Sequence, residues 1–117
     1  MKDSGQHGPT ILIVEDVDWI RSGMKNSVES YGYHVLEATN DVEAIETAEP
    51  EPPALIMTEE ELPSFDALMT LLREHPSLRH VPVFIINPDA DEGARYGDAF
   101  LLIDYESISS LLASLRG

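Results

Sequence analysis

The sequence of 117 residues contains no cysteine, which excludes disulfide bonds, thiolate catalysis and cysteine-ligated metal sites. Basic residues are scarce, because 7 lysines and arginines stand against 22 aspartates and glutamates, for a formal net charge of −15. Such a surface repels phosphate backbones and anionic lipid. We therefore expect neither nucleic acid nor a membrane as a partner.

Long apolar runs are also missing. No stretch approaches the roughly 20 apolar residues of a membrane-spanning helix. The polar start of the chain, residues 1–9, lacks the apolar core of a signal peptide. We expect a cytoplasmic location, a flexible leader over residues 1–9, and a single domain over residues 10–117 that is long enough for one packed core.

Short apolar runs alternate with amphipathic stretches along the chain. The runs are continuous in branched residues, which is typical of parallel strands buried on both faces. Strands that alternate with helices predict an α/β fold with helices on both faces of a parallel sheet. Right-handed crossovers favour a flavodoxin-like, doubly wound, five-stranded sheet with strand order 2-1-3-4-5. The expected strands cover residues 10–14, 33–38, 55–58, 81–86 and 100–103.

The first two helices are expected after the first two strands. Apolar residues spaced three or four apart define the buried face of the first helix, and Gly32 is placed to end it in a left-handed turn. Trp19 lies off this face and should be exposed. Asn40 with Glu43 resembles a capping box that opens the second helix. The apolar positions are Val17, Ile20, Met24, Val28 and Tyr31 in the first helix, and Val42, Ile45 and Ala48 in the second.

The later helices are less regular. Ser64 is placed to cap a third helix, whereas only twelve residues, 87–98, separate the fourth strand from the fifth. A complete crossover with its helix needs at least about 10–12 residues, and Pro88, Gly93 and Gly97 weaken a helix there. We expect a shortened or missing fourth helix. A last helix should run from about Glu106. The expected buried residues are Phe65, Leu68, Met69 and Leu72 in the third helix, and Ile108, Leu111, Leu112 and Leu115 in the last.

Acidic residues follow two of the expected strands directly. The apolar run from Leu55 stops at three consecutive glutamates, of which Glu59 comes first. The first strand likewise ends at Glu15 and Asp16. Open α/β sheets place their ligand sites at the carboxyl ends of the strands, so these acids mark a candidate site. We expect Glu60 and Glu61 to lie in a solvated loop.

The order of these signals resembles the receiver domain of two-component response regulators, over about residues 10–116. In that family two acids after the first strand hold Mg²⁺, and an aspartate ending the third strand accepts a phosphoryl group. A serine or threonine after the fourth strand responds, and a lysine after the fifth strand pairs with the phosphate. The matching residues are Ile11–Asp16, Arg21, Gly32–Val35, Ala38, Glu43–Ala44, Leu55–Ile56, the acid four positions before Pro63, and Pro82–Val83.

Three positions of that pattern are changed here. The phosphoacceptor position falls on Glu59 and the switch position on Asn87. The lysine position falls on Asp104, or on Ile103 if one gap is allowed; the only lysines of the sequence are Lys2 and Lys25. The acidic pair itself survives as Glu15 and Asp16.

The resemblance therefore implies a degenerate, stand-alone receiver domain that is not an enzyme and requires no cofactor. We expect it to signal by binding another signalling protein without phosphorylation, as a monomer or weak dimer, and Trp19 is a candidate partner contact. One alternative is a phosphorelay receiver that is still phosphorylated with Mg²⁺. A second is a divalent-cation module that binds Mg²⁺ or Ca²⁺ through Glu15, Asp16 and Glu59.

Overall fold

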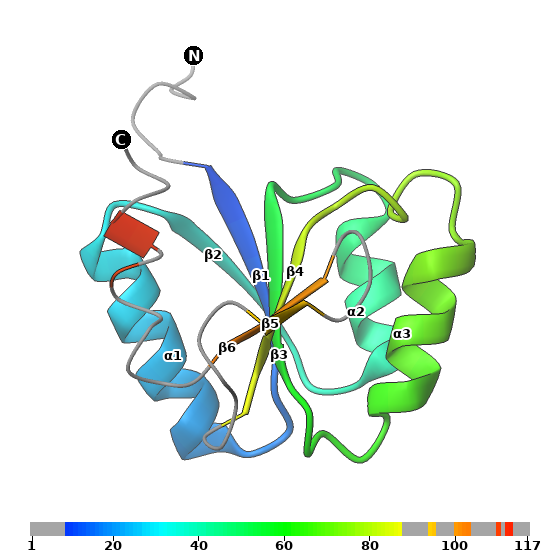
Figure 1. Ribbon diagram of the computed structural model, residues 1–117. Helices are drawn as coiled ribbons and strands as arrows, with labels where there is room; N and C mark the ends of the chain where they lie inside the picture. The colour runs from blue at the N-terminus through cyan, green and yellow to red at the C-terminus, as the bar shows by residue number, and fades with distance from the viewer. Residues whose placement is uncertain (1–8, 88–93, 96–99, 104–109, 111, 114–117) are drawn as a thin grey trace.

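The computed structural model describes residues 9–87, 94–95, 100–103, 110 and 112–113 (Figure 1). The expected leader, except Pro9, lies outside the described residues. So do most of the crossover after the fourth strand and most of the last helix, including Ile108, Leu111 and Leu115. No helix in the described part of the chain is long and apolar enough to cross a membrane.

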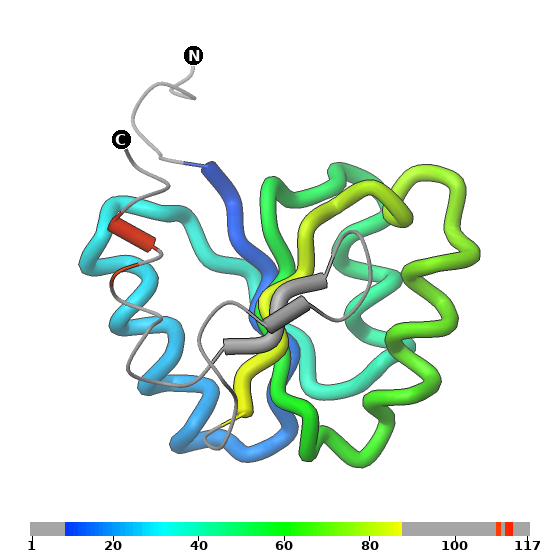
Figure 2. The backbone as a smooth tube through the Cα atoms, viewed as in Figure 1, coloured from blue at the N-terminus to red at the C-terminus, as the bar shows by residue number. Residues whose placement is uncertain are grey.

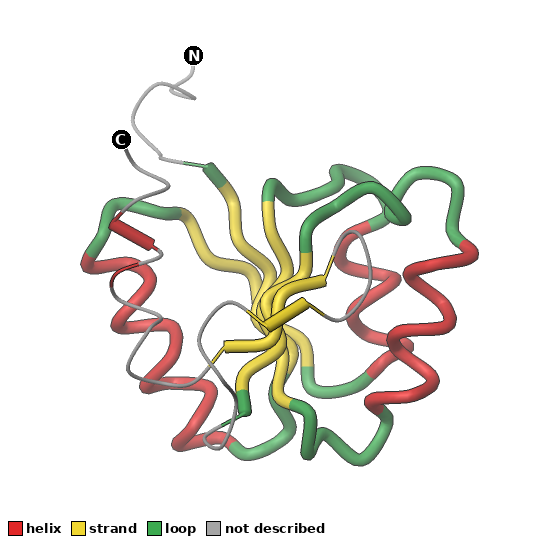
Figure 3. Tube along the Cα trace, viewed as in Figure 1, coloured by secondary structure: helices red, strands yellow, loops and turns green. Residues whose placement is uncertain are grey.

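One sheet forms the centre of the molecule, with strand order β2-β1-β3-β4-β6-β5 (Figure 3). The first five strands in this order are parallel, and β5 pairs antiparallel with β6 at the edge. Since β6 is the expected fifth strand, the predicted order 2-1-3-4-5 is confirmed. The strands are β1 (Thr10–Val14), β2 (His34–Ala38), β3 (Leu55–Glu59), β4 (Val83–Ile86), β5 (Ala94–Arg95) and β6 (Phe100–Ile103).

Helices cover both faces of this sheet (Figure 2). Helix α1 (Asp18–Ser30) lies on one face, and α2 (Asp41–Ala48) and α3 (Phe65–Glu74) lie on the other. The described residues between β4 and β6 form β5 and no helix. Residues 88–93 and 96–99 lie outside the described residues. The prediction of a shortened or missing fourth helix is therefore not tested over those positions.

Two apolar cores are separated by the sheet, because successive side chains of a strand point to opposite faces. Ile11 and Ile13 of β1 pack on the α1 side, whereas Leu12 and Val14 pack on the α2 and α3 side. Leu112 of the C-terminal segment belongs to the α1 side, where the hydroxyl of Tyr33 donates to its carbonyl oxygen over 2.8 Å. Strands β1, β3 and β4 are therefore buried on both faces, as their continuous apolar sequences predict, whereas the edge strand β2 leaves His34 and Glu37 exposed.

Local signals explain most helix boundaries. Gly32 has a φ of 91°, which only glycine adopts at little cost, and it follows Tyr31, the residue that caps the C-terminus of α1. The Asn40 side chain accepts from the Glu43 amide over 2.9 Å, while the Glu43 carboxylate accepts from the Thr39 amide over 2.8 Å. The predicted cap of α2 is thus confirmed, and the Glu43 carboxylate reaches one residue further back than in the usual capping box.

Three expectations about these helices are wrong. Val17, expected on the buried face of the first helix, precedes α1 as its N-cap residue and is 36% exposed. Val42 is 57% exposed, and the inward stripe of this short helix runs through Ala44, Ile45 and Ala48, so only the first of its three predicted positions is wrong. Ser64 precedes α3 but makes no side-chain bond to it. Its hydroxyl instead accepts from the Asp41 amide over 3.2 Å, so it satisfies a donor at the start of the neighbouring helix α2.

Candidate functional site: an acid pair at the carboxyl edge of the sheet

The predicted site residues come from three neighbouring strands. Glu15 follows β1, Glu59 ends β3 and Asn87 follows β4, all at the edge of the sheet that holds the carboxyl ends of the parallel strands. We call this the carboxyl edge. Strand register explains the proximity, since Val14 pairs with Thr58 and Glu59 pairs with Ile86. The Thr58 hydroxyl, buried in the same register, donates to the Val14 carbonyl over 3.1 Å.

Glu15 is the buried member of this group, with only 1% of its surface exposed. Its Oε2 accepts from the Val17 amide over 2.9 Å, which ties the carboxylate to the turn before α1. Its Oε1 is buried and accepts no hydrogen bond from any described residue. A buried oxygen without a donor is costly, so Glu15 needs either a proton or a positively charged partner.

Glu59 lies beside Glu15, and the two carboxyl groups affect each other. Burial first, and then hydrogen bonding with the half-buried Glu59, raise the pKa of Glu15 from 4.5 to about 8. The Val17 amide acts in the opposite direction, and Asp16 makes a smaller contribution that also raises this pKa. Two carboxylates cannot donate to each other, so a proton held by Glu15 at neutral pH supplies the hydrogen bond that the ionised pair lacks.

Asn87 contacts Glu60, the acid next to Glu59 in the sequence. Its side-chain amide donates to Oε1 of Glu60. Alternation along the strands explains this choice, because Glu59 follows the Met57 side of β3, which faces α1, while Glu60 and Asn87 have the opposite parity. Glu60 is half-buried by this contact, so the expectation of a solvated loop holds only for Glu61, which is exposed.

The remaining predicted acids do not complete a metal site. Asp16 is exposed, and Asp104 lies outside the described residues, next to Ile103 at the end of β6. Within the described part of the chain, no group of three or more acidic, histidine or cysteine residues is arranged to hold a metal ion. The acids that the structure brings together are thus the pair Glu15 and Glu59.

Arg21 is the cation that approaches Glu15, although it binds the main chain. Its Nη1 donates to the Glu15 carbonyl over 2.9 Å, while Nε and Nη2 donate to Glu37 and Asp18 over 3.1 and 2.7 Å. The hydrogen bond to Asp18 raises the pKa of Arg21 above its ordinary value, and the hydrogen bond to Glu37 adds a smaller increase. Sequence reasoning matched Arg21 to the family pattern but did not foresee this contact, because it depends on where β2 places Glu37.

Exposed apolar residues lie at the carboxyl edge of the sheet. Trp19, in the first turn of α1, is 77% exposed, which confirms the prediction that it lies off the buried face. Val17, whose amide binds Glu15, is 36% exposed, and Val42 is the second residue of α2, which starts at the same edge. These three are among the four large apolar residues that are exposed in the described part of the chain.

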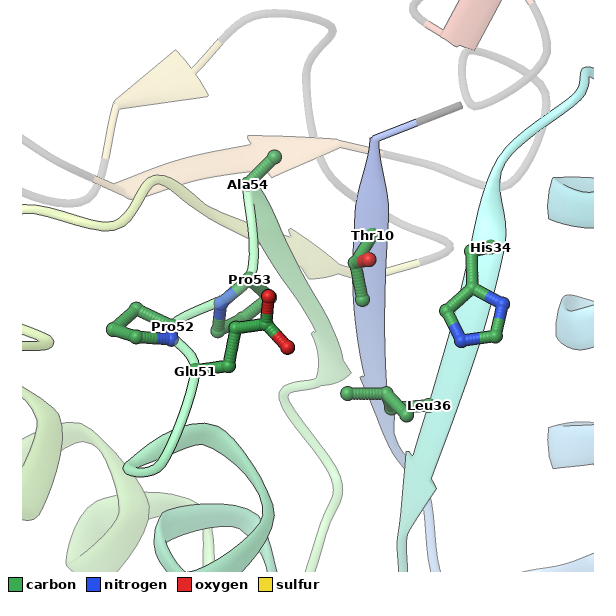
Figure 4. Close-up of a pocket in the computed structure, with 7 residues that line it drawn as sticks. All are labelled: Thr10, His34, Leu36, Glu51, Pro52, Pro53 and Ala54. Carbon is green, nitrogen blue, oxygen red and sulfur yellow. The ribbon is translucent and has the colours of Figure 1, made fainter. Parts of the chain in front are cut away.

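A hollow at the opposite edge of the sheet was not anticipated from the sequence. It has a volume of about 340 Å³ and is formed where the first two strands begin and the α2–β3 connection passes them (Figure 4). The proline-rich segment before β3 contributes to the lining of this hollow. From the sequence alone, these prolines predict only the end of a helix. The lining residues are Thr10, His34, Leu36, Glu51, Pro52, Pro53 and Ala54.

Comparisons with known proteins agree with this architecture. The polar-differentiation response regulator DivK of Brucella anthropi is 29% identical over 86 residues, which are 72% of this chain and 70% of the relative. The signal receiver domain of a signal transduction histidine kinase from Syntrophus aciditrophicus is 26% identical. Its structure superposes with a TM-score of 0.71 over 92% of this chain and 91% of the other.

A further solved structure shows the fold alone. The receiver domain of a sensor histidine kinase from Pseudomonas aeruginosa, described with a magnesium ion in its active-site cleft, is 21% identical. It covers 92% of this chain and 96% of its own, with a TM-score of 0.75. A family model described as the response regulator receiver domain matches residues 11–97, most of the chain. This chain therefore belongs to the response regulator receiver domain family.

Proposed function

We propose that this receiver domain acts by binding another signalling protein without being phosphorylated. The observation that carries the proposal is the pair of Glu15 and Glu59, which share the place where a receiver performs its chemistry. The pair meets no cation among the described residues. A cytoplasmic, monomeric or weakly dimeric protein that contacts neither nucleic acid nor membrane fits the net charge of −15.

Phosphoryl transfer depends on positioning and on charge stabilisation. Glu59 carries its carboxylate one methylene further than an aspartate at the same position. The buried carboxyl of Glu15 beside it raises the cost of placing a phosphoryl group there, unless a cation enters. Arg21, whose guanidinium binds the Glu15 carbonyl, is already held by Asp18 and Glu37. Losing a preorganised charge partner typically lowers such rates by orders of magnitude.

Asn87 supports the same interpretation. A receiver that responds to phosphate uses a hydroxyl after its fourth strand, and Asn87 has an amide in that place. This amide is bound to Glu60, on the other side of the sheet from the acid pair. A phosphoryl group on Glu59 would therefore have no hydroxyl at this position to draw toward it.

Intact-mass measurement after incubation with acetyl phosphate and Mg²⁺ tests the proposal. The wild-type chain should show no phosphate adduct, and Glu61→Asp, which changes an exposed neighbour, should behave identically. Glu59→Asp restores the shorter side chain of an aspartate acceptor. Any remaining capacity of the chain to be phosphorylated should therefore appear in this variant. A stoichiometric adduct on the wild type that disappears in Glu59→Gln would overturn the proposal in favour of a phosphorelay receiver.

A divalent cation is the second candidate ligand, favoured by the unpaired Oε1 of buried Glu15. Carboxylate oxygens suit Mg²⁺ and Ca²⁺, and either ion would neutralise the pair. Glu15 and Glu59 would hold it with Asp16, although Asp16 is exposed and the described residues form no three-ligand group. Calorimetric titration with each metal decides this: heat at millimolar metal that is absent in Glu15→Gln would establish the cation module.

A further inference from the structure

Two hollows meet at the amino ends of the parallel strands, at the edge of the sheet opposite to the acid pair. The first, of about 340 Å³, lies on the α2 side of the sheet, where Leu36 packs against the core of that side. The second, of about 170 Å³, lies on the α1 side, because Tyr33 and Phe84, which line it, belong to the core of that side. Both hollows are lined by Ala54, which is exposed, so a single ligand can reach both.

Backbone hydrogen bonds hold the walls of the first hollow in place. The Ala54 amide donates to the Thr10 carbonyl over 2.8 Å, which fixes the α2–β3 connection against β1. The His34 amide donates to the Pro9 carbonyl over 3.1 Å, which fixes the start of β2 on the other side of β1. The connection also contains two consecutive prolines, which restrict its backbone. A hollow with fixed walls loses little conformational freedom when a ligand enters.

One wall of the first hollow carries a negative charge. Glu51 is exposed, and its carboxylate points toward the two strands (Figure 4). None of the ion pairs among the described residues involves Glu51. The Thr10 hydroxyl offers a second acceptor, whereas Leu36 and the two prolines of the lining are apolar. This lining favours a ligand that has a positive charge, several hydrogen-bond donors and an apolar stem.

Other classes of ligand fit this lining less well. An anion would meet both the Glu51 carboxylate and the net charge of −15. A metal ion would find only Glu51 and His34 as ligating side chains of the lining, and the described part of the chain holds no group of three or more such residues. An uncharged apolar ligand would cover the polar groups of Glu51 and Thr10 without giving them partners, which is costly.

We propose that the first hollow binds the guanidinium group of an arginine from a protein partner, and that an apolar residue of the same segment enters the second hollow. The inference rests on the proposed function, because it takes the ligand from a partner protein. A guanidinium group presents its donors in a planar fork that matches a carboxylate, so Glu51 and Thr10 can both accept from it. The apolar stem of the arginine then packs on Leu36.

The two hollows contribute to binding in different ways. An ion pair with an exposed carboxylate adds little affinity, so Glu51 mainly determines which residue enters the first hollow. The second hollow adds affinity, because it removes an apolar side chain from water. A capped arginine alone should therefore bind weakly, and a segment that fills both hollows should bind more tightly.

Titration of the isotope-labelled full chain with N-acetyl-arginine amide, followed by amide NMR shifts, tests the first hollow. The amides of Thr10, His34 and Ala54 should shift. N-acetyl-citrulline amide has nearly the same shape without the charge, so it should bind about fivefold weaker or more. The arginine probe should lose the same affinity on Glu51→Gln. Glu61→Gln is the matched control, because it removes one exposed charge at the carboxyl edge, and it should bind the arginine probe like wild type.

Peptides displayed on phage test the second hollow. A random library is first depleted of peptides that bind Glu51→Gln and is then selected on the wild-type chain. Enriched peptides should contain an arginine and an apolar residue, and they should shift the amides of Ile11, Leu55 and Phe84 in addition to those of the first hollow. Replacing the apolar residue of the peptide by serine should remove only these additional shifts.

The inference is overturned if the arginine and citrulline probes bind alike, if Glu51→Gln binds the arginine probe like wild type, or if the probe shifts only amides outside the two hollows. Each of these outcomes leaves the proposed function in place. A stoichiometric phosphate adduct would instead remove the proposed function without changing the measured binding of arginine. Circular dichroism establishes that each variant is folded.

Discussion

The two edges of the sheet hold their connections in different ways. At the carboxyl edge, side-chain oxygens bind backbone amides: Glu15 binds Val17, Asn40 binds Glu43, and Ser64 binds Asp41. At the opposite edge, which we call the amino edge, the conformation of the connections is fixed mainly by glycine and proline residues of the backbone. Gly32 adopts a positive φ there, and the connections contain Pro50, Pro52, Pro53, Pro76 and Pro82.

This difference separates a charge-sensitive edge from a rigid one. Proline and glycine set the backbone without any ionisable group, whereas one of the side chains that hold the carboxyl edge, Glu15, changes charge with pH. Among the described residues, the amino edge also has ionisable contacts at His75, which binds Glu49 over 2.9 Å and whose Nδ1 accepts from the Ser77 amide over 3.1 Å, but Glu49 is exposed. Function that responds to pH is therefore expected at the carboxyl edge, where side-chain oxygens bind the backbone amides of the connections.

The largest expected effect is the pH dependence that Glu15 imposes. Its pKa is raised from 4.5 to about 8 in the folded chain, so the folded state holds a proton that the unfolded state releases. This stabilisation is complete below pH 4.5 and is lost as the pH rises toward 8. At about 1.4 kcal/mol per pKa unit, wild type should lose roughly 2–3 kcal/mol between pH 6 and 8.5.

Urea unfolding across this pH range checks the prediction. Glu15→Gln keeps an acceptor for the Val17 amide and donates to Glu59, so the loss should nearly vanish and the variant should be more stable than wild type at pH 8.5. Glu51→Gln, at the exposed start of the α2–β3 connection, should follow the wild-type curve. An unchanged slope in Glu15→Gln would contradict the account of the acid pair.

The second effect concerns the amino edge and requires no charge. Gly32→Ala places a Cβ at a φ of 91° and should cost about 1–2 kcal/mol of unfolding free energy at every pH. Gly23 is the matched control, because it lies inside α1 and an added Cβ meets nothing within 4 Å. Gly23→Ala should stabilise by about 0.5–1 kcal/mol. Shifts of the urea midpoint in the same direction for both variants would contradict the assignment.

The smallest effect returns to the carboxyl edge. Asn40→Ala removes the oxygen that accepts from the Glu43 amide and should cost about 1 kcal/mol, measured by thermal unfolding. Ser30→Ala, which removes an exposed hydroxyl bonded to the Ser27 carbonyl near the end of α1, should change stability by less than about 0.5 kcal/mol. Equal losses of stability in Asn40→Ala and Ser30→Ala would contradict this prediction, because uncharged side-chain hydrogen bonds would then stabilise the two edges to the same extent.

Periodicity was sufficient to predict the parallel sheet and its order, because continuous branched runs such as Ile11–Val14 have few alternatives to a strand buried on both faces. It failed for Val42, since a helix of eight residues offers too few positions to define its inward stripe. Ser64 was misjudged for another reason. Its partner Asp41 is 23 residues away, and no local pattern encodes that distance.

The candidate site was predictable in position but not in its electrostatics. That Glu15 and Glu59 meet follows from parallel strands that end at one edge. The burial of Glu15 and the exposure of adjacent Asp16 depend on how the chain turns into α1, where the Val17 amide captures one carboxylate and leaves its neighbour in solvent. Likewise, the preference of Asn87 for Glu60 is decided by strand parity, which only the register reveals.

The run of three glutamates after Thr58 gives this edge a tolerance to misregistration. A one-residue slip in a strand exchanges the faces of all its side chains, which would ordinarily remove a site residue from its neighbours. A slip that moves Glu60 into the place of Glu59 also moves Glu61 into the place of Glu60, so one acid remains beside Glu15 and another beside Asn87. A slip in the opposite direction would put Thr58 beside Glu15. The negative charge of this edge therefore tolerates a one-residue shift of β3 in one direction only.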